Sequence, residues 1–492
     1  MKNILEKYKE AVEHRSQNES KYRRNEKYYL GKHWKNIDED SMSIKDFYPV
    51  SNHIFKVIEV ILPIMADIEP TMYIDPYKKD DINRERAKKL QLLLQHEWMD
   101  QSVPQSLWRG VKSGLIHGHC AFFVQSLIQE SKAKKIGFEV EPLTVWEYFL
   151  DPYTKEFKDS RYFIRRVFLP LDVIKERYKT NPAVEDKETV KRYYVDEFWT
   201  KDKVYTIIAG TIIRTEPNKY GRLPFALWVD YEVPGRIEGL GEVDILLSMQ
   251  REVNVRMKQI IDNANAMGNG IWVGTDEDQE IDNTPGGYVH KDINEQLKRE
   301  MPVPLANSYF TQIDNIEREI EQISGVNELS QGRVKGEMSG EALKILKHSN
   351  YTRIRQKTRN LEETLRQIGG LITNIILTRY ELPIDIAQNE QMTPIKGREI
   401  GEFEYQVRVL PGTMRIKNEA DDMQLSLMLY KMGAFGNPQS YDAIEELLTG
   451  TNYIGKKRVL DKLKTGGNNG NTEQTGNAES NNGETGSAES NT

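Results

Sequence analysis

The sequence predicts a helix-rich α+β protein with a disordered C-terminal tail. Long segments with helical periodicity occupy both ends of the chain, and two of them, 241–267 and 309–324, contain no proline. Between about 118 and 228, β-branched and aromatic runs alternate with Gly, Pro, Asn and Asp, which is typical of strands and turns. The final segment, 465–492, has almost no apolar side chains to bury, which predicts disorder.

Composition limits the classes of function. The 492 residues are enough for about two to four domains. The chain has 68 Lys and Arg against 75 Asp and Glu, which gives a net charge of −7. A protein that binds nucleic acid over its whole surface would be basic, so such binding is not expected here. The single cysteine excludes an intrachain disulfide. The most apolar run, 57–68, is too short to cross a membrane and the N-terminus has no apolar signal core, so we expect a soluble protein made inside the cell.

The first 117 residues are expected to be mostly helical. An apolar segment, 55–70, should form one helix, and 82–100 combines a 3.6-residue period with strong helix formers. A β-rich layer should follow from about residue 118, interrupted by one helix near 171–178 and containing a hairpin turn at 209–210.

The middle of the chain predicts a pair of helices. Segment 241–267 should form a helix about 40 Å long, a small β-like module with GIWVG and GGYVH follows at 268–304, and a second helix, 305–324, runs back. We expect a hairpin-like stalk whose apolar positions are exposed and pack against neighbouring subunits, the alternative being an ordinary pair within one chain. These positions are Leu246, Leu247, Met249, Val253, Ile313, Ile316, Ile320 and Ile323.

A long helix is predicted from about 339 to 380, with a kink at Gly369-Gly370. A strand at 403–411 and short helices to about 463 should follow. Part of the long helix is basic and free of acids, so we expect a solvated face or pairing with acidic neighbours, with contact to a polyanion as the alternative. Its basic residues are Lys347, Arg353, Arg355, Lys357 and Arg359.

The glycine-rich segment 325–339 invites comparison with a phosphate-binding loop. In that motif a lysine follows the last glycine, whereas here Lys335 precedes Gly336, and no strand leads into the loop. Nucleotide binding is therefore disfavoured. We expect Gly325 to end one helix and Ser339 to cap the next.

Two further motifs suggest metals but lack the required spacing. The sequence HGHC, 117–120, has no second ligand pair, which favours a strand entry with a partly buried Cys120 over a zinc site. Segment 275–282 resembles the start of a calcium-binding loop, but Ile281 stands where that loop needs glycine, and Gly287 stands where the loop needs glutamate. These mismatches favour an acidic surface loop. Signatures such as HExxH and GxSxG are absent, so we expect no enzyme activity, catalytic residue, metal site or cofactor.

Several segments, in this order along the chain, carry a resemblance to a known family. They are YYLGKHWKN with SNHIFKVIEVILPIMADIEPTMYIDP, then VWEYFLDPYTKEFKDSRYFIRRVFLP, then GRLPFALWVDYEVPGRIEGLGEVDILLSMQREVNVRMKQIID, then ISGVNELSQGRVKGEMSGEAL. Together they resemble the portal protein of tailed bacteriophages, the head-to-tail connector, and are closest to the podophage type over about 22–463.

The resemblance implies a portal-type fold with a β-rich wing, a two-helix stem, a small α/β clip, a long kinked helix and a helical crown. The implied boundaries are a wing at 1–240 (N-terminal helices 1–117, β-rich layer 118–240), stem helices at 241–267 and 305–324, a clip at 268–304, a tunnel loop at 325–339, the long helix with a wing return strand at 340–418, a crown at 419–464 and the tail at 465–492.

The resemblance also implies a function. A ring, expected to be a dodecamer, would sit at one capsid vertex, and double-stranded DNA would be packaged and ejected through it without sequence-specific contacts. The implied partners are the terminase large subunit, then head-completion or adaptor and tail proteins, and the major capsid and scaffold proteins. The protein would be made in the host bacterial cytoplasm and end in the virion, with no membrane partner. Another oligomeric structural or scaffolding virion protein is the alternative, and an NTPase is disfavoured.

The same resemblance suggests where contacts would lie. The tunnel loop would present Gln331, Arg333 and Lys335 to DNA. The candidates for basic residues facing a channel are Arg256, Lys258, Arg318, Arg353 and Arg355. The candidates for partner contacts on the clip are Trp272, Asp276, Asp278, Tyr288, His290 and Lys291.

Overall fold

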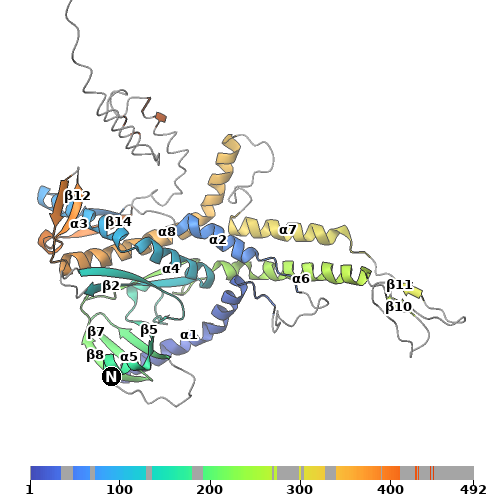
Figure 1. Ribbon diagram of the computed structural model, residues 1–492, viewed down its shortest axis with the longest axis horizontal. Helices are drawn as coiled ribbons and strands as arrows, with labels where there is room; N and C mark the ends of the chain where they lie inside the picture. The colour runs from blue at the N-terminus through green and yellow to red at the C-terminus, as the bar shows by residue number, and fades with distance from the viewer. Residues whose placement is uncertain are drawn as a thin grey trace, which may run out of the picture. The chain divides into compact units, whose positions relative to one another are not determined.

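A computed structural model gives the arrangement of the chain (Figure 1). Contacts divide the chain into two units, Met1–Met414 and Arg415–Thr492, and every labelled helix and strand lies in the first. The protein is α+β and rich in helix, as predicted. The structure describes residues 2–34, 48–66, 72–128, 136–179, 192–268, 271–273, 298–300, 304–326, 340–388 and 391–409, together with 427, 428, 430, 431, 444 and 447. The predicted crown thus lies almost wholly outside the described residues, and the predicted tail entirely so.

Four helices occupy the N-terminal part, as the sequence predicts. Helix α3 begins where the Asp80 carboxylate accepts a hydrogen bond from the Asn83 backbone N–H at 2.7 Å. Helix α4 ends at Gly118, whose φ of 104° favours glycine. The bounds are α1 (Lys2–Tyr29), α2 (His53–Ala66), α3 (Asp81–Asp100) and α4 (Val103–His117).

The β-rich part contains a five-stranded antiparallel sheet with the order β4-β5-β6-β7-β8. Ala209 and Gly210 both have positive φ and make the β7–β8 turn, which confirms the predicted hairpin. Helix α5 (Leu171–Tyr178) interrupts the sheet at the predicted place, and Ala11 of α1 packs on the sheet. The strands are β4 (Tyr148–Phe149), β5 (Phe163–Pro170), β6 (Arg192–Trp199), β7 (Lys203–Ile208) and β8 (Thr211–Pro217), with a short 3-10 turn, η3, at Phe157–Asp159.

A second, three-stranded sheet with the order β3-β2-β9 lies against α4 and α8. Strands β2 and β3 form a long antiparallel ladder from Ala121–Leu143 to Ile128–Ile136, and β9 pairs with the first half of β2. The bounds are β2 (His119–Ile128), β3 (Ile136–Leu143), β9 (Phe225–Val229) and α8 (Gly340–Arg379).

Helices α6 (Glu242–Gly268) and α7 (Asn307–Ser324) run side by side, as predicted (Figure 1). At their far end, β10 (Ile271–Val273) pairs with β11 (Lys298–Glu300), whereas the GGYVH segment lies outside the described residues. Helix α7 stops at Gly325, whose φ is 73°, which confirms the predicted helix end.

Three short strands were not predicted. Strand β1 (Met72–Pro76) pairs with β14 (Tyr405–Val409), the predicted late strand, so the chain after α8 returns to its N-terminal part. Strands β12 (Ile384–Gln388) and β13 (Gln391–Ile395) form a hairpin, which a 3-10 turn, η4 (Arg398–Ile400), follows.

Helix α8 is long, and in Figure 1 its N-terminal part runs in another direction from the rest of the helix. The kink at Gly369-Gly370 stays a prediction. The first of these glycines allows close packing, because a Cβ there would lie 2.9 Å from Met72 Sδ and 3.0 Å from Val407 Cγ1. A Cβ at Gly370 would meet nothing within 4 Å.

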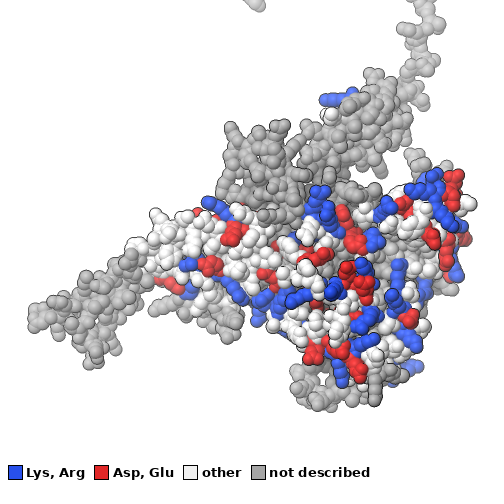
Figure 2. Space-filling model, turned by 180° about the vertical axis from the view of Figure 1, so that it is seen from behind, with Lys and Arg blue, Asp and Glu red and all other residues white. Residues whose placement is uncertain are grey.

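Charges of both signs cover the surface. On the face in Figure 2, Lys and Arg side chains are interspersed with Asp and Glu over the described residues. Many are in contact, for example Arg23 with Glu19 at 2.8 Å and Lys89 with Glu85 at 2.7 Å. Among the described helices, none is long and apolar enough to cross a membrane.

The two adjacent glycines of α8 should respond differently to alanine. Gly370→Ala should raise the free energy of unfolding by about 0.5–1 kcal/mol, because alanine restricts the unfolded chain and nothing obstructs its methyl group. Gly369→Ala has the same intrinsic advantage but must displace Met72 and Val407, so it should be less stable than Gly370→Ala. Urea unfolding of both variants measures this, and equal stabilities would contradict it.

Candidate functional site

The base of α6 is built around an enclosed lysine. Lys357, from α8, has 1% of its surface exposed. Its Nζ lies 2.6 Å from Glu242 Oε1, forms a hydrogen bond to Asp230 Oδ1, and sits 3.5 Å from the centroid of the Tyr231 ring. Asp230 follows β9, and Glu242 is the first residue of α6. The Lys357 ammonium group therefore links α8 to the end of β9 and to the start of α6.

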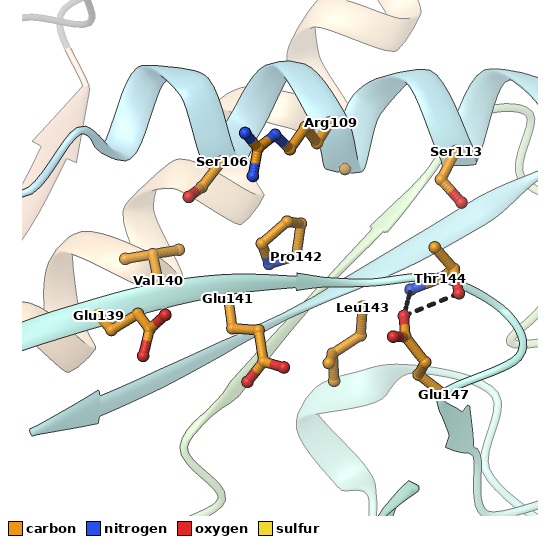
Figure 3. A pocket seen from close by; sticks show the side chains of 11 residues that line it. Ser106, Arg109, Ser113, Glu139, Val140, Glu141, Pro142, Leu143, Thr144 and Glu147 are labelled. Carbon is orange, nitrogen blue, oxygen red and sulfur yellow. Dashed lines mark hydrogen bonds between the residues drawn. The ribbon is translucent and has the colours of Figure 1, made fainter. Parts of the chain in front are cut away.

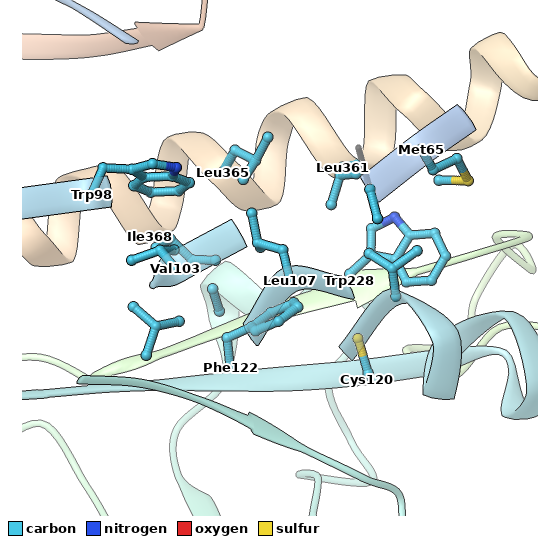
Figure 4. Close-up of a cluster of buried hydrophobic side chains, with 14 of the residues drawn as sticks. Met65, Trp98, Val103, Leu107, Cys120, Phe122, Trp228, Leu361, Leu365 and Ile368 are labelled. Atoms are coloured by element: carbon cyan, nitrogen blue, oxygen red, sulfur yellow. The ribbon is translucent and has the colours of Figure 1, made fainter. Parts of the chain in front are cut away.

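The same face of α8 bonds directly to strand β9. Asn360 Nδ2 donates to the carbonyl of Val229 at 3.1 Å, and Thr364 Oγ1 donates to the carbonyl of Leu227 at 3.1 Å. Lys357, Asn360 and Thr364 follow the spacing of one helix face. Apolar side chains from α2, α3, α4 and α8 complete the contact with β2 and β9 (Figure 4), namely Met65, Trp98, Val103, Leu107, Cys120, Phe122, Trp228, Leu361, Leu365 and Ile368.

Helix α1 is tied to the same place through Asp244 of α6. The Asp244 carboxylate accepts from Arg24 Nη2 at 2.8 Å and Asn25 Nδ2 at 3.1 Å, and lies 3.1 Å from Lys21 Nζ. At Gly241, just before α6, an added Cβ would lie 2.7 Å from the carbonyl oxygen of Leu115. The start of α6 is therefore held by α1, α4 and α8 together.

The HGHC segment forms the junction between α4 and β2. His117 Nδ1 lies 3.0 Å from the carbonyl of Ser113, and His119 Nε2 lies 3.1 Å from Tyr22 Oη. Burial lowers the pKa of His117 to about 4 and that of His119 to about 3, so both rings are neutral at pH 7. Cys120 is fully buried, which corrects the expectation of partial burial. In the described part of the chain, no group of three or more His, Cys, Asp or Glu side chains is placed to hold a metal ion.

The apolar stripe of the paired helices is largely covered within one chain. Leu246, Val253, Ile316 and Ile320 are buried, so the expectation that the whole stripe is exposed is wrong and the intramolecular alternative holds for these four positions. Periodicity identified the apolar face but not its cover, which is α2 together with the partner helix. Two other apolar side chains of the pair are open to solvent, Val255 at 40% and Phe310 at 49% exposure.

The predicted basic candidates fall into two groups. On α6, Arg256 Nη2 lies 2.7 Å from Glu252 Oε1, and Lys258 pairs with Asp262 and lies 5.0 Å from the Tyr48 ring centroid. Arg318 of α7 and Arg355 of α8 are exposed instead. The last candidate, Arg353, is in α8 with its side chain outside the described part.

Other candidates lie beyond what the structure describes. Trp272 is in β10 opposite Arg299, although its side chain is not among those described. The residues wholly outside the described ranges are Gln331, Arg333 and Lys335 of the predicted tunnel loop, and Asp276, Asp278, Tyr288, His290 and Lys291 of the predicted clip. Segment 275–282, weighed as a calcium loop, also lies there.

A hollow of about 370 Å³ lies between α4 and β3 (Figure 3). Ser113 and Arg109 of α4 face it, but Glu139 and Glu141 leave β3 on the side away from α4. Glu141 is paired with Arg165 at 2.5 Å. The charged groups around this hollow therefore do not point toward one another. A binding or catalytic pocket would require polar groups that converge.

Two families of phage portal proteins match the chain. Residues 199–453 match the family described as the phage SU10 portal protein, and residues 5–209 match the family described as the phage P22-like portal protein. No curated protein matches the sequence.

These matches, together with the α+β fold, define a portal protein of a tailed phage, of the podophage type, as the resemblance suggested. Since the first match covers more than half of the 492 residues, the chain belongs to the phage SU10 portal protein family. Its role is therefore structural, as a component of the phage particle.

Sequence reasoning found Lys357 only as one member of a basic run. That run was expected to be solvated or paired with acids, and for Lys357 the pairing is confirmed. Its partners, Asp230 and Glu242, lie more than 100 positions earlier in the chain, so no local pattern identifies them.

Removing the enclosed cation should be costly. Lys357→Met should lower the free energy of unfolding by about 3–5 kcal/mol, because the two buried acids lose the only cation that contacts them both among the described residues. Arg355→Met, at an exposed position on the same helix, is the matched control and should change it by less than about 0.5 kcal/mol. Urea unfolding followed by circular dichroism tests the pair, and similar losses in both variants would count against a special role for Lys357.

Proposed function

We propose that the protein assembles into a ring-shaped channel at one capsid vertex, through which double-stranded DNA is packaged and later ejected. The observation that carries the proposal is the pair of portal-family matches, which together span residues 5–453. The twelve-subunit ring expected from the resemblance is part of the proposal.

The parts of a portal protein are assigned to elements as follows. Helices α6 and α7 form the stem, because they are long, lie side by side and end in the small β10–β11 pair, which belongs to the clip. The helices before Gly118 and the two sheets form the wing, and β14 is its return strand. The segment between α7 and α8 is the tunnel loop.

Neighbouring subunits are proposed to meet along the stem. Val255 and Phe310 are large apolar side chains that are 40% and 49% exposed on paired helices whose Leu246, Val253, Ile316 and Ile320 are buried. Because each is already about half covered, burying it against a second copy would contribute about 1 kcal/mol. Closed rings use one such lateral contact repeatedly.

Weak contact with DNA suits a conduit. Each phosphate contact adds affinity and so resists sliding. Arg256 and Lys258 are neutralised by Glu252 and Asp262 of their own helix, which leaves them less available to phosphates. Arg318, Arg355 and the tunnel-loop residues Arg333 and Lys335 remain the proposed DNA-facing charges.

The clip is the proposed docking surface for the terminase large subunit during packaging and afterwards for head-completion or adaptor and tail proteins. The remaining partners, the major capsid and scaffold proteins, would contact the wing side. The protein would be made in the host bacterial cytoplasm.

Negative-stain electron microscopy of the purified full-length protein tests the ring. Top views should show a closed ring with a central hole, and side views a narrower stem below a wider wing. Particles without a hole would reject the channel and favour another oligomeric structural or scaffolding role. Truncation after Lys464 is the control and should leave the rings unchanged.

Deleting the tunnel loop should separate assembly from DNA handling. A chain lacking residues 331–338 should still form rings, because the stem and wing elements are intact, but should package or retain less DNA. The measurement is the DNA content of assembled particles compared with those of the full chain. Failure of the deleted chain to form rings would instead make the loop an assembly element.

A further inference from the structure

The Lys357 cluster contains one cation and two acids in a site closed to water. Lys357 has 1% of its surface exposed, and Asp230 and Glu242 have none. If both carboxyl groups were ionised, the site would hold a net negative charge. Burying an uncompensated charge is strongly unfavourable, and such a group is usually neutralised by a proton.

The surrounding elements do not offset this charge. Asp244 of α6 adds a further carboxylate nearby, and its own partners, Lys21 and Arg24, come from α1. Strand β2 contributes Cys120, whose pKa is raised by burial, so this thiol is neutral at pH 7. Among the residues that the structure describes, Tyr231 is a further ionisable neighbour, and burial raises its pKa, so it is also neutral.

The two carboxyl groups differ in their surroundings. Glu242 is the first residue of α6, where the positive end of the helix dipole stabilises a negative charge, and its Oε1 lies 3.4 Å from the Tyr231 hydroxyl. Asp230 follows a strand and has no such dipole. Each carboxyl group also has one buried oxygen without a hydrogen-bond partner, Asp230 Oδ2 and Glu242 Oε2, so a second negative charge in the site is costly and the helix dipole favours placing the first on Glu242.

We propose that the cluster is a proton-controlled clamp, in which Asp230 holds one proton while the site is closed and loses it when the site opens to water, so that the attachment of α8 to β9 and α6 weakens as the pH rises toward 8. The proton moves between the Asp230 carboxyl and solvent. Lys357 stays paired with Glu242 in the closed site.

The expected pKa values agree with this geometry. Burial raises the pKa of Asp230 to about 8, Lys357 opposes the rise and Glu242 adds to it. Burial lowers the pKa of Lys357, but Asp230 and Glu242 outweigh it and raise the pKa above its usual range. A carboxyl group whose pKa is higher in the folded than in the unfolded protein stabilises the fold while it is protonated. For Asp230 this stabilisation is complete below the unfolded pKa of about 3.9 and is lost as the pH rises toward 8.

Infrared spectroscopy of the assembled full-length protein tests the proton directly. At pH 6 the wild type should show the band of a buried protonated carboxyl group, and this band should disappear by pH 10. Asp230→Asn should lack the band at both pH values while keeping the fold, because the amide has nearly the same shape. Glu242→Gln should also lack the band, because Asp230 alone then balances the charge of Lys357 and needs no proton.

Hydrogen exchange tests the clamp. After correction for the intrinsic pH dependence of exchange, the opening constant of residues 354–366 should rise about tenfold per pH unit between pH 5 and 8 in the wild type. The same constant should stay nearly flat in Asp230→Asn.

Four outcomes would overturn the proposal. They are the absence of the band at pH 6 in the wild type, its persistence in Asp230→Asn, and an equally steep rise of the opening constant in that variant. The fourth is retention of the band in Glu242→Gln, since the excess of acids over cations would then not be the cause of the bound proton.

Discussion

The packing of the long helix depends on a buried ion cluster. An ammonium group enclosed by protein must keep its hydrogen-bonded partners, so α8 is stable only where Asp230 and Glu242 can reach Lys357. This requirement fixes the end of β9 and the start of α6 relative to α8. Apolar contacts alone would tolerate a small shift along the helix, whereas a hydrogen-bonded ion pair would not.

A second buried polar contact fixes the other end of α8. The hydroxyl of Tyr380, just past the helix, donates to Glu97 of α3 at 2.6 Å. Between Lys357 and Tyr380 the buried side of the helix is mostly apolar, its buried Thr364 and Thr373 hydroxyls donate to backbone carbonyls, and Gly369 lets β1 and β14 approach. Helix α8 therefore links the base of α6 to the N-terminal helices through two polar contacts joined by a continuous core.

Local patterns predicted the long elements well. Helices α3, α6 and α7, the short helix α5 and the hairpin at Ala209-Gly210 all lie where periodicity and turn chemistry placed them. Strands β1, β12 and β13 were missed because five residues carry little periodicity, and β1 also pairs with the distant strand β14. The ion cluster was missed because its partners are equally distant in sequence. The cover of the stem's apolar stripe could not be predicted, since periodicity identifies a buried face but not its partner.

The distribution of charge bears on the proposed conduit. A chain with a net charge of −7 repels DNA overall, which limits the affinity of any contact with DNA. Arg256 and Lys258 already pair with Glu252 and Asp262 of their own helix, so these cations are less available to phosphates. In the proposed channel, such pairing would leave few free cations on α6 for DNA to contact. Fewer phosphate contacts mean weaker binding, which favours sliding over tight binding.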